Sequence, residues 1–183
     1  NDRGFEVIGV NVRFDRTTVA VAGLTGKTGA MLAFPTPARP SDLVARLVEA
    51  TDALVAPHGR QPSKSIQQIG VSLPGLVDSN TGRVRWLPRL PGYSNFDLAA
   101  ALKAALGPPV AVDNDANLGA LAEFTLALSG HDTMKDFVLL DLGAEGVGGG
   151  VVLNGELYRG HDAVLAGEFG HMVVDANGLE CSC

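Results

Sequence analysis

Apolar and polar positions alternate along the first part of the chain in a way that predicts three short β-strands. These segments are rich in β-branched and apolar residues, and they lie at residues 5–13, 17–24 and 30–37. Prolines stop the third segment. Because the joins between them are short and polar or contain glycine, we expect an antiparallel meander.

Beyond residue 40 the apolar spacing is that of helices alternating with strands. A helix is predicted after Ser41, which we expect to be its N-cap, and it ends before Pro57. Strands are predicted at 65–75 and 109–113, and helices at 96–107, with Gly107 at its C-terminus, and at 116–128. The order βββαβαβα predicts an α/β protein whose mixed sheet carries helices on its faces.

Strand-like segments return after a polar stretch at 129–136. They lie at residues 137–143, 147–157 and 171–175. We therefore predict a first domain over residues 1–113 and a second domain over residues 114–183.

Composition limits the classes of protein to which the chain can belong. Hydrophobic residues make up 46% and charged residues 19%, which suits a globular core and argues against disorder. The net charge of −6 makes the chain a poor candidate for holding a polyanion by itself. No apolar run reaches the roughly 20 residues of a membrane span, and no signal peptide opens the chain. We expect a cytoplasmic protein without a membrane partner.

The ends and the cysteines of the chain add two expectations. The first residue is Asn1 rather than Met, which suggests an excised piece of a longer protein. Cys181 and Cys183 are the only cysteines, too few and too close together for a disulfide framework.

Three polar side chains, Asp113, Asn114 and Asp115, stand where a predicted strand gives way to a helix. Ligands of open α/β sheets bind near such strand ends, where an Asp can act as a base or accept a hydrogen bond from a hydroxyl group. Asp and Asn are also the preferred capping residues of helices. The two roles are compatible, and both stay open.

The tail of the chain offers a second group of candidate residues. His171, Cys181 and Cys183 supply nitrogen and sulfur donors, one short of a tetrahedral structural zinc site. The alternatives are a core histidine and ordinary buried thiols. A glycine-rich run ending at Gly150 resembles a phosphate-binding loop. Glu145 inside it would repel a phosphate, so a structural hairpin is favoured.

Four stretches of the chain together resemble the ROK family, which takes its name from repressors, open reading frames and kinases. They are IGVSLPGLVD at 69–78, VDNDANLGALAE at 112–123, AGEFGH at 166–171 and GLECSC at 178–183. The resemblance implies the actin-like, ribonuclease-H-like two-lobed fold of sugar kinases, with an incomplete second lobe in this chain. It also implies homodimers or homotetramers.

The resemblance assigns roles to individual residues. It implies a structural zinc held by His171, Cys181 and Cys183, with a fourth ligand beyond the end of the chain. Asp115 matches the general base of the family's kinases. The residues that it implies for sugar binding are Gly75, Asn114, Asp115, Glu168 and His171.

The chain departs from the family's kinases at both phosphate loops. Where kinases carry Asp-x-Gly-Gly-Thr, this sequence has Asn11, Arg13, Phe14 and Asp15, and Glu145 replaces the Thr of the second loop. Arg89 stands where kinases place an Asn near the sugar. We therefore expect no bound ATP and no catalytic residue.

The predicted function is that of a sugar-sensing effector domain of a ROK-family transcriptional repressor. It would bind a hexose or a hexose derivative and modulate DNA binding by a helix-turn-helix domain absent from this chain. The alternative is an ATP-dependent hexose kinase of the same family, with Asp115 as its catalytic base.

Overall fold

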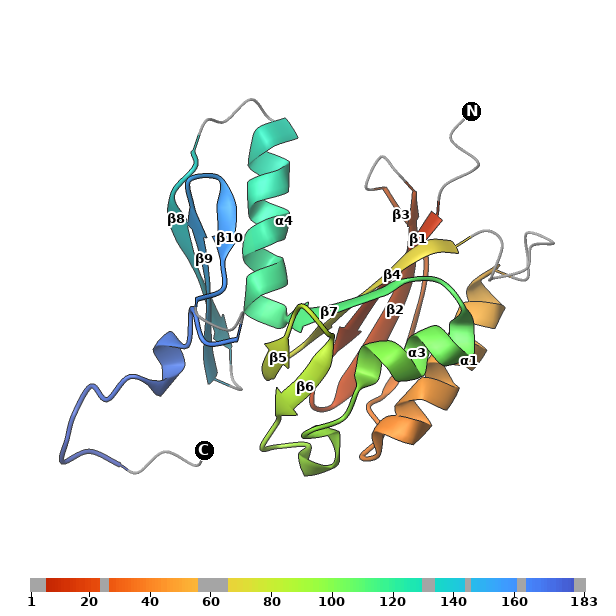
Figure 1. Ribbon diagram of the computed structural model, residues 1–183, viewed down its shortest axis with the longest axis horizontal. Coiled ribbons are helices and arrows are strands. Elements are labelled where there is room, and N and C mark those ends of the chain that lie inside the picture. The colour runs from red at the N-terminus through yellow and green to blue at the C-terminus, as the bar shows by residue number, and fades with distance from the viewer. Residues whose placement is uncertain are drawn as a thin grey trace. The chain divides into compact units, whose positions relative to one another are not determined.

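The computed structural model describes residues 6–23, 27–55, 66–129, 134–143, 146–160 and 164–179. Contacts divide the chain into unit 1, Asn1–Asn114, and unit 2, Asp115–Cys183. The division falls inside the Asp-Asn-Asp stretch, one residue after the predicted boundary. Figure 1 shows a mixed sheet with helices in unit 1, and one helix with a small sheet in unit 2.

Unit 1 is built on a five-stranded sheet of order β3-β2-β1-β4-β7. The strands β1 (Glu6–Val12), β2 (Arg16–Gly23) and β3 (Thr28–Pro35) pair antiparallel, which confirms the predicted meander. The strands β4 (Ile66–Leu73) and β7 (Val110–Asn114) continue the sheet parallel to β1.

Two helices, α1 (Pro40–Val55) and α3 (Leu98–Leu106), pack on one face of this sheet. Alternate strand residues meet the helices there, and the core includes Ile8, Val10, Val19, Leu43, Leu47, Val71, Leu98 and Leu102. The burial of these side chains is the main favourable contribution to the stability of unit 1.

The ends of the helices test two predicted caps. Ser41 is not the N-cap of α1, because the helix begins at Pro40 and the carbonyl of Arg39 accepts the N–H groups of residues 42 and 43. Proline is favoured at the first position of a helix, where its missing N–H costs nothing. At α3, Asp97 accepts the N–H of Ala100, and Gly107 ends the helix at a φ of 96°, as predicted.

A hairpin of β5 (Leu76–Asp78) and β6 (Arg83–Trp86) lies between β4 and α3, where the sequence predicted no strand. Asp78 holds its turn: one carboxylate oxygen accepts the N–H groups of Asn80 and Thr81, and the other accepts Arg85 Nη2 at 2.5 Å. Burial raises the pKa of Asp78, but these donors outweigh it and leave the pKa below its usual range.

A short 3₁₀ helix, η2 (Pro91–Tyr93), follows the hairpin. Tyr93 is fully buried, and its hydroxyl donates to the carbonyl of Pro37 at 2.7 Å. Burial raises the pKa of this phenol, so it stays a hydrogen-bond donor at neutral pH.

Unit 2 consists of one helix against a three-stranded antiparallel sheet of order β10-β9-β8. The elements are α4 (Asp115–Ser129), β8 (Phe137–Gly143), β9 (Gly146–Leu153) and β10 (Glu156–Tyr158). Asn154 and Gly155 both have positive φ, at 54° and 78°, and form a two-residue turn. The single strand predicted at 147–157 is therefore two strands of a hairpin.

The predicted strand at 171–175 is wrong. The chain forms a 3₁₀ turn, η4 (Phe169–His171), and then bends and turns without any strand pairing among the described residues. Val173 and Val174 are 82% and 94% exposed. Their β-branched side chains favour extended backbone, but a strand also needs a neighbour to pair its peptide groups.

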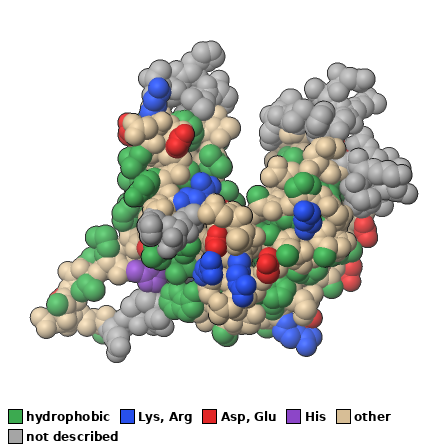
Figure 2. Space-filling model, viewed as in Figure 1, with side chains coloured by type: hydrophobic (Ala, Val, Ile, Leu, Met, Phe, Trp, Pro, Cys, Tyr) green, Lys and Arg blue, Asp and Glu red, His purple; other side chains and the backbone are tan. Residues whose placement is uncertain are grey.

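The face of the small sheet away from α4 carries exposed apolar side chains. Val138, Leu140 and Leu142 of β8 alternate with Leu139, whose side chain lies against α4. Figure 2 shows hydrophobic side chains gathered over this unit. None of the helices in the described part of the chain is long and apolar enough to span a membrane.

Replacement of Asp78 tests the hairpin. Asp78→Asn removes the ion pair with Arg85, so we expect the free energy of unfolding to fall by about 1–3 kcal/mol at neutral pH. Because the folded-state pKa is lowered, this contribution is complete above the ordinary value of 3.8 and is lost as the pH falls through the lowered value. Urea unfolding at a series of pH values measures it.

The matched control for this measurement is Asp52→Asn on the exposed face of α1. It should leave stability within about 0.5 kcal/mol. A deficit in Asp78→Asn that persists unchanged into strong acid would contradict the ion-pair explanation.

Candidate functional site

The carboxyl ends of the parallel strands β1, β4 and β7 meet at one edge of the sheet in unit 1. Near this edge, Asn11, Ser72 and Asp113 lie in register across the three strands. The hydroxyl of Ser72 donates to Oδ1 of Asn11 at 3.0 Å. Ligands of open α/β sheets bind outside such an edge.

At this edge the structure brings Gly75 and Asn114 together. Nδ2 of Asn114 donates to the carbonyl of Gly75 at 3.2 Å. A Cβ atom at Gly75 would lie 2.8 Å from the carbonyl oxygen of Trp86 and 2.9 Å from Leu87, so this turn requires glycine. Asp113 in turn accepts the N–H of Asn114 at 2.8 Å.

The β1–β2 turn carries an aromatic side chain. Phe14 packs against the core of unit 1, and the guanidinium carbon of Arg89 lies 3.9 Å from the centre of its ring. This is a cation–π contact between two segments that are distant in the sequence. The hydroxyl of Thr36 donates to the carbonyl of Arg13 at 2.6 Å and fixes the backbone of the same turn.

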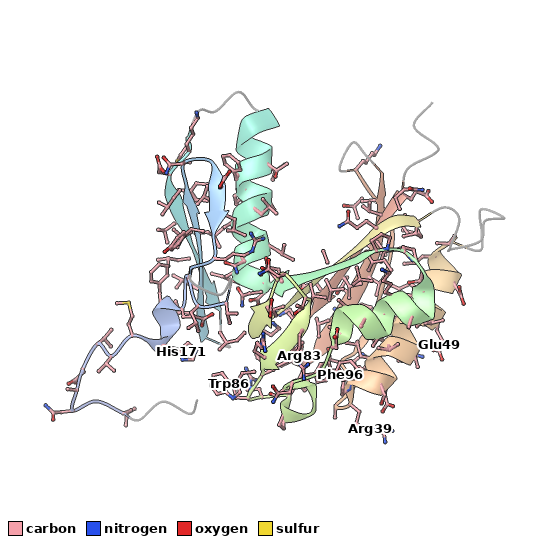
Figure 3. All side chains as sticks on the ribbon, in the orientation of Figure 1. Arg39, Glu49, Arg83, Trp86, Phe96 and His171 are labelled. Atoms are coloured by element: carbon pink, nitrogen blue, oxygen red, sulfur yellow. The ribbon has the colours of Figure 1, made fainter. Side chains whose placement is uncertain are left out.

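Two arginines of the 83–89 segment have separate contacts and do not form one cluster of positive charge. Arg85 is paired with Asp78, while Arg89 covers Phe14. In Figure 3, Arg83 and Trp86 mark the β6 strand that leads toward Arg89.

In unit 2 the structure places Asp115, Glu168 and His171 within electrostatic reach of one another. Asp115 is the first residue of α4, and its Oδ1 accepts the N–H of Ala116 at 3.0 Å. Nε2 of His171 lies 3.6 Å from Oε2 of Glu168. Burial raises the pKa of Glu168, His171 opposes this rise, and the carboxylate of Asp115 adds to it.

Both expectations for the Asp-Asn-Asp stretch are compatible with this geometry. Asp113 and Asp115 each accept the N–H of the following residue, which is a local backbone role. Each unit also brings one of these side chains to another candidate: Asn114 contacts Gly75 within unit 1, and the charge of Asp115 contributes to the raised pKa of Glu168 within unit 2. That they bind a sugar stays a prediction.

The glycine-rich run is a structural hairpin, as the sequence favoured. Gly146 to Gly150 form the first part of β9, which pairs with β8. A Cβ atom at Gly150 would lie 2.5 Å from the carbonyl oxygen of Ala116 and 2.6 Å from Cβ of Ala120, so this glycine lets α4 approach the strand. Glu145 lies outside the described residues.

Only one of the three predicted zinc ligands belongs to the described residues. His171 is described, and its side chain is 47% exposed on η4, where Figure 3 labels it. Cys181 and Cys183 lie outside the described residues. The described residues contain no group of three or more His, Cys, Asp or Glu that could hold a metal. Imidazole and thiolate donors, as here, are the set that structural zinc prefers.

Sequence reasoning missed two side chains of this region, Ser72 and Phe169. Ser72 is a polar residue in the apolar run IGVSL, which was the available signal, whereas its position opposite Asn11 is seen only in the structure. Phe169 lies inside the Glu-Phe-Gly-His motif, and its contact with Gly149 depends on folding.

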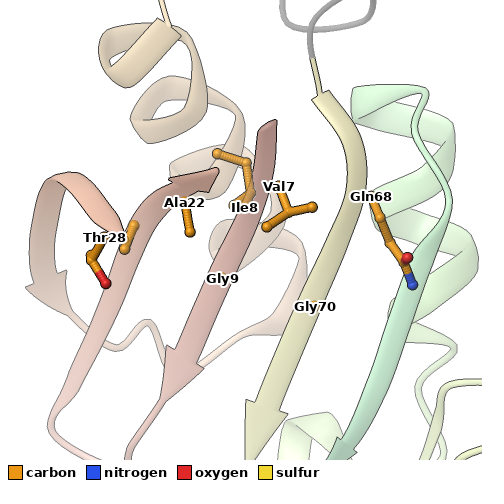
Figure 4. A pocket seen from close by; sticks show the side chains of 8 residues that line it. Val7, Ile8, Gly9, Ala22, Thr28, Gln68 and Gly70 are labelled. Carbon is orange, nitrogen blue, oxygen red and sulfur yellow. The ribbon is translucent and has the colours of Figure 1, made fainter. Parts of the chain in front are cut away.

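A shallow trough on the uncovered face of the unit 1 sheet is a separate feature. Figure 4 shows it between β1, β2 and β4, lined by small and apolar residues with Thr28 and Gln68 at its borders. Its lining holds no titratable side chain, so it offers no acid–base chemistry.

Comparison with known proteins identifies the family. The ROK family profile matches residues 7–183, and the chain belongs to this family. The family contains both transcriptional repressors and sugar kinases among the relatives of this chain.

The curated relatives include both classes at similar identity. A glucokinase of Thermotoga maritima is 37% identical over 75% of this chain and 39% of its own length. A putative xylose repressor of a Caldicellulosiruptor species is 38% identical over 66% of this chain and 29% of its own length. The chain thus spans about half or less of the length of the relatives it matches.

Solved structures similar to this chain also include both a transcriptional regulator and sugar kinases, and they establish the actin-like sugar kinase fold. A ROK family transcriptional regulator, described as a homologue of the E. coli MLC protein, superposes with a TM-score of 0.82. The two sequences are 28% identical, and the superposition covers 100% of this chain and 45% of the regulator's chain. A ROK glucokinase from Streptomyces griseus, in complex with glucose and AMPPNP, gives 0.79 at 26% identity, over 95% of this chain and 52% of its own.

Replacement of Asn114 tests the contact that orients the Gly75 turn. Asn114→Asp exchanges the donor amide for an acceptor facing a carbonyl oxygen, so we expect a loss of about 1–3 kcal/mol in the free energy of unfolding. Chemical denaturation measures this loss, with Asn80→Asp on the exposed hairpin turn as the control. Equal stability of the two variants would show that the hydrogen bond does not hold the turn.

Proposed function

We propose that this chain is the sugar-sensing part of a ROK-family transcriptional repressor that carries out no phosphoryl transfer. The observation that carries the proposal is Phe14 of the β1–β2 turn, whose ring packs against the core of unit 1 and lies under the guanidinium of Arg89. The similarity to a solved ROK transcriptional regulator over the whole chain supports it.

The turn that carries Phe14 bears directly on nucleotide binding. Phosphate loops of this kind use small residues so that backbone N–H groups can approach the phosphate oxygens. Phe14 adds an aromatic ring at that position, and Asp15 and Glu145 add negative charge to the two loops. A carboxylate near a polyphosphate opposes binding wherever water is excluded.

The proposed sugar ligands are polar groups of the kind that hydroxyls need. Carboxylates of Asp115 and Glu168 would accept hydrogen bonds from sugar hydroxyls, the amide of Asn114 can donate or accept, and Gly75 belongs to the turn that Asn114 contacts. A hexose or hexose derivative bound there would shift a conformational equilibrium, and a DNA-binding domain outside this chain would respond to that shift.

The second candidate function is an ATP-dependent sugar kinase, with Asp115 as general base. The observation that favours it is the similarity to kinases: two β-glucoside kinases from Listeria species are 44% and 43% identical to the chain over 110 residues. In that case the β1–β2 turn would have to bind phosphate with Phe14 in place.

The decisive experiment measures ADP release by the full-length protein with ATP and a panel of hexoses and N-acetylhexosamines. Thermal shift on the same samples reports sugar binding. Stabilisation by a sugar without ADP release supports the sensor. ADP release that Asp115→Ala abolishes would overturn it in favour of the kinase.

Truncation of the two carboxylates tests the proposed pocket. Asp115→Ala and Glu168→Ala each remove a group that accepts sugar hydroxyls, so we expect sugar affinity to fall by about 2–4 kcal/mol in each variant. Isothermal calorimetry measures the affinity, and Glu123→Ala on the exposed face of α4 is the control. Unchanged affinity in both variants would refute the pocket.

We further propose that His171, Cys181 and Cys183 hold a structural zinc ion. The metal would tie the turn that contains Glu168 to the following segment and supply no catalytic chemistry. We expect about one zinc per full-length chain by elemental analysis, falling well below that in Cys181→Ser. Metal-free protein from a zinc-containing medium would contradict the assignment.

A further inference from the structure

The loop that carries Glu168 and His171 lies directly against the backbone of β9. A Cβ atom at Gly149 would lie 2.5 Å from the carbonyl oxygen of Gly167 and would also collide with the ring of Phe169. A Cβ atom at Gly167 would collide with the carbonyl of Gly149, and one at Gly170 with the carbonyl of Val147. We call this set of contacts the β9–loop contact.

The β9–loop contact is tightly packed, and two features inside the loop restrict its backbone as well. Cβ atoms approach other heavy atoms to less than 3.0 Å essentially never, so neither side of the contact has space for a side chain. Gly167 also has a φ of 85°, which disfavours any residue with a Cβ. The N–H of Phe169 donates to the carbonyl of Gly167 at 2.7 Å, and the N–H of His171 to that of Glu168 at 3.1 Å.

The opposite face of β9 brings in the other carboxylate. Gly148 and Gly150 face α4, where a Cβ atom at Gly148 would lie 3.1 Å from Cβ of Ala116. Ala116 follows Asp115, so one short glycine run has the helix of Asp115 on one face and the loop of Glu168 on the other. Burial raises the pKa of Glu168, His171 opposes this rise, and the negative charge of Asp115 adds to it.

We propose that Gly149 is a positioning residue: the β9–loop contact holds Glu168 beside Asp115, and it does so without the metal. A side chain at Gly149 would lift the loop from the strand and move Glu168 away from Asp115, although it touches neither carboxylate. The proposal rests on the proposed function for its consequence, sugar affinity, but the contact itself is independent of any ligand.

The test compares Gly149→Ala with Gly119→Ala in the full-length protein. Gly119→Ala is a matched control because its added Cβ would meet Leu139 at an ordinary distance of 3.6 Å in the same unit. Hydrogen exchange followed by mass spectrometry reports the loop without any ligand. We expect exchange over residues 164–172 to rise by about tenfold or more in Gly149→Ala, with α4 and β8 unchanged, and no rise in the control.

Sugar affinity by calorimetry is the second readout. We expect a loss of about 10- to 100-fold in Gly149→Ala, the effect of losing a hydrogen bond to a charged group, and none in the control. If the unsubstituted protein binds no sugar, the proposed function fails, and the exchange comparison alone still decides on the β9–loop contact.

Two outcomes would overturn the positioning role. One is unchanged exchange over residues 164–172 in Gly149→Ala. The other concerns unsubstituted protein from which a chelator has removed the metal. If its loop exchanges as fast as the loop of Gly149→Ala, the metal and not the β9–loop contact positions Glu168. If Gly149→Ala does not fold, Phe169→Ala removes the aromatic side of the same contact without adding an atom. It should raise exchange in the same segment.

Discussion

The close approach of two backbones to one strand is the constraint on which unit 2 depends. Gly148 and Gly150 let α4 lie against β9 on one face, and Gly149 admits the loop of Glu168 on the other. Each missing Cβ removes the layer of side chains that would otherwise separate the elements. The run resembles a phosphate loop in sequence, and three of its glycines, Gly148, Gly149 and Gly150, have a packing role in the strand. Glycine enrichment near a site can therefore reflect how the site is held together as well as what it binds.

In unit 1, hydrogen bonds rather than close backbone packing hold the candidate residues in place. Its parallel strands end at one edge, and there Ser72 bonds Asn11 while Asn114 bonds the Gly75 turn. At the same edge, Phe14 lies under the guanidinium of Arg89. The bulky ring of Phe14 at the β1–β2 turn thus lies beside a sheet edge whose polar side chains are held by hydrogen bonds.

Local signals predicted most of the fold, and the failures have physical causes. Alternation and β-branched residues located the meander, and Gly107 marked the end of α3 because its left-handed backbone suits glycine. Residues 171–175 have the composition of a strand, but no strand in the described part of the chain pairs with them, and composition does not encode pairing. The Asn154–Gly155 turn was a readable hairpin signal inside an assumed single strand. At the site, the residue types were predictable from the motifs. The contacts of Phe14 with Arg89 and of Gly149 with Gly167 join distant segments and needed the structure.

The choice between sensor and enzyme depends on which binding energy the site must supply. A kinase has to bind the transferring phosphoryl group better in the transition state than in the ground state, so its phosphate loops cannot accept bulk or negative charge without loss of rate. A sensor needs only a sugar that binds one conformation better than another. A carboxylate that binds a sugar hydroxyl would serve both functions, because the base of a kinase also accepts a hydrogen bond from the sugar. Kinase and repressor relatives at 37% and 38% identity are what this overlap predicts. The residues that separate the two functions are those of the phosphate loops, and at the β1–β2 turn this chain carries an aromatic ring covered by an arginine.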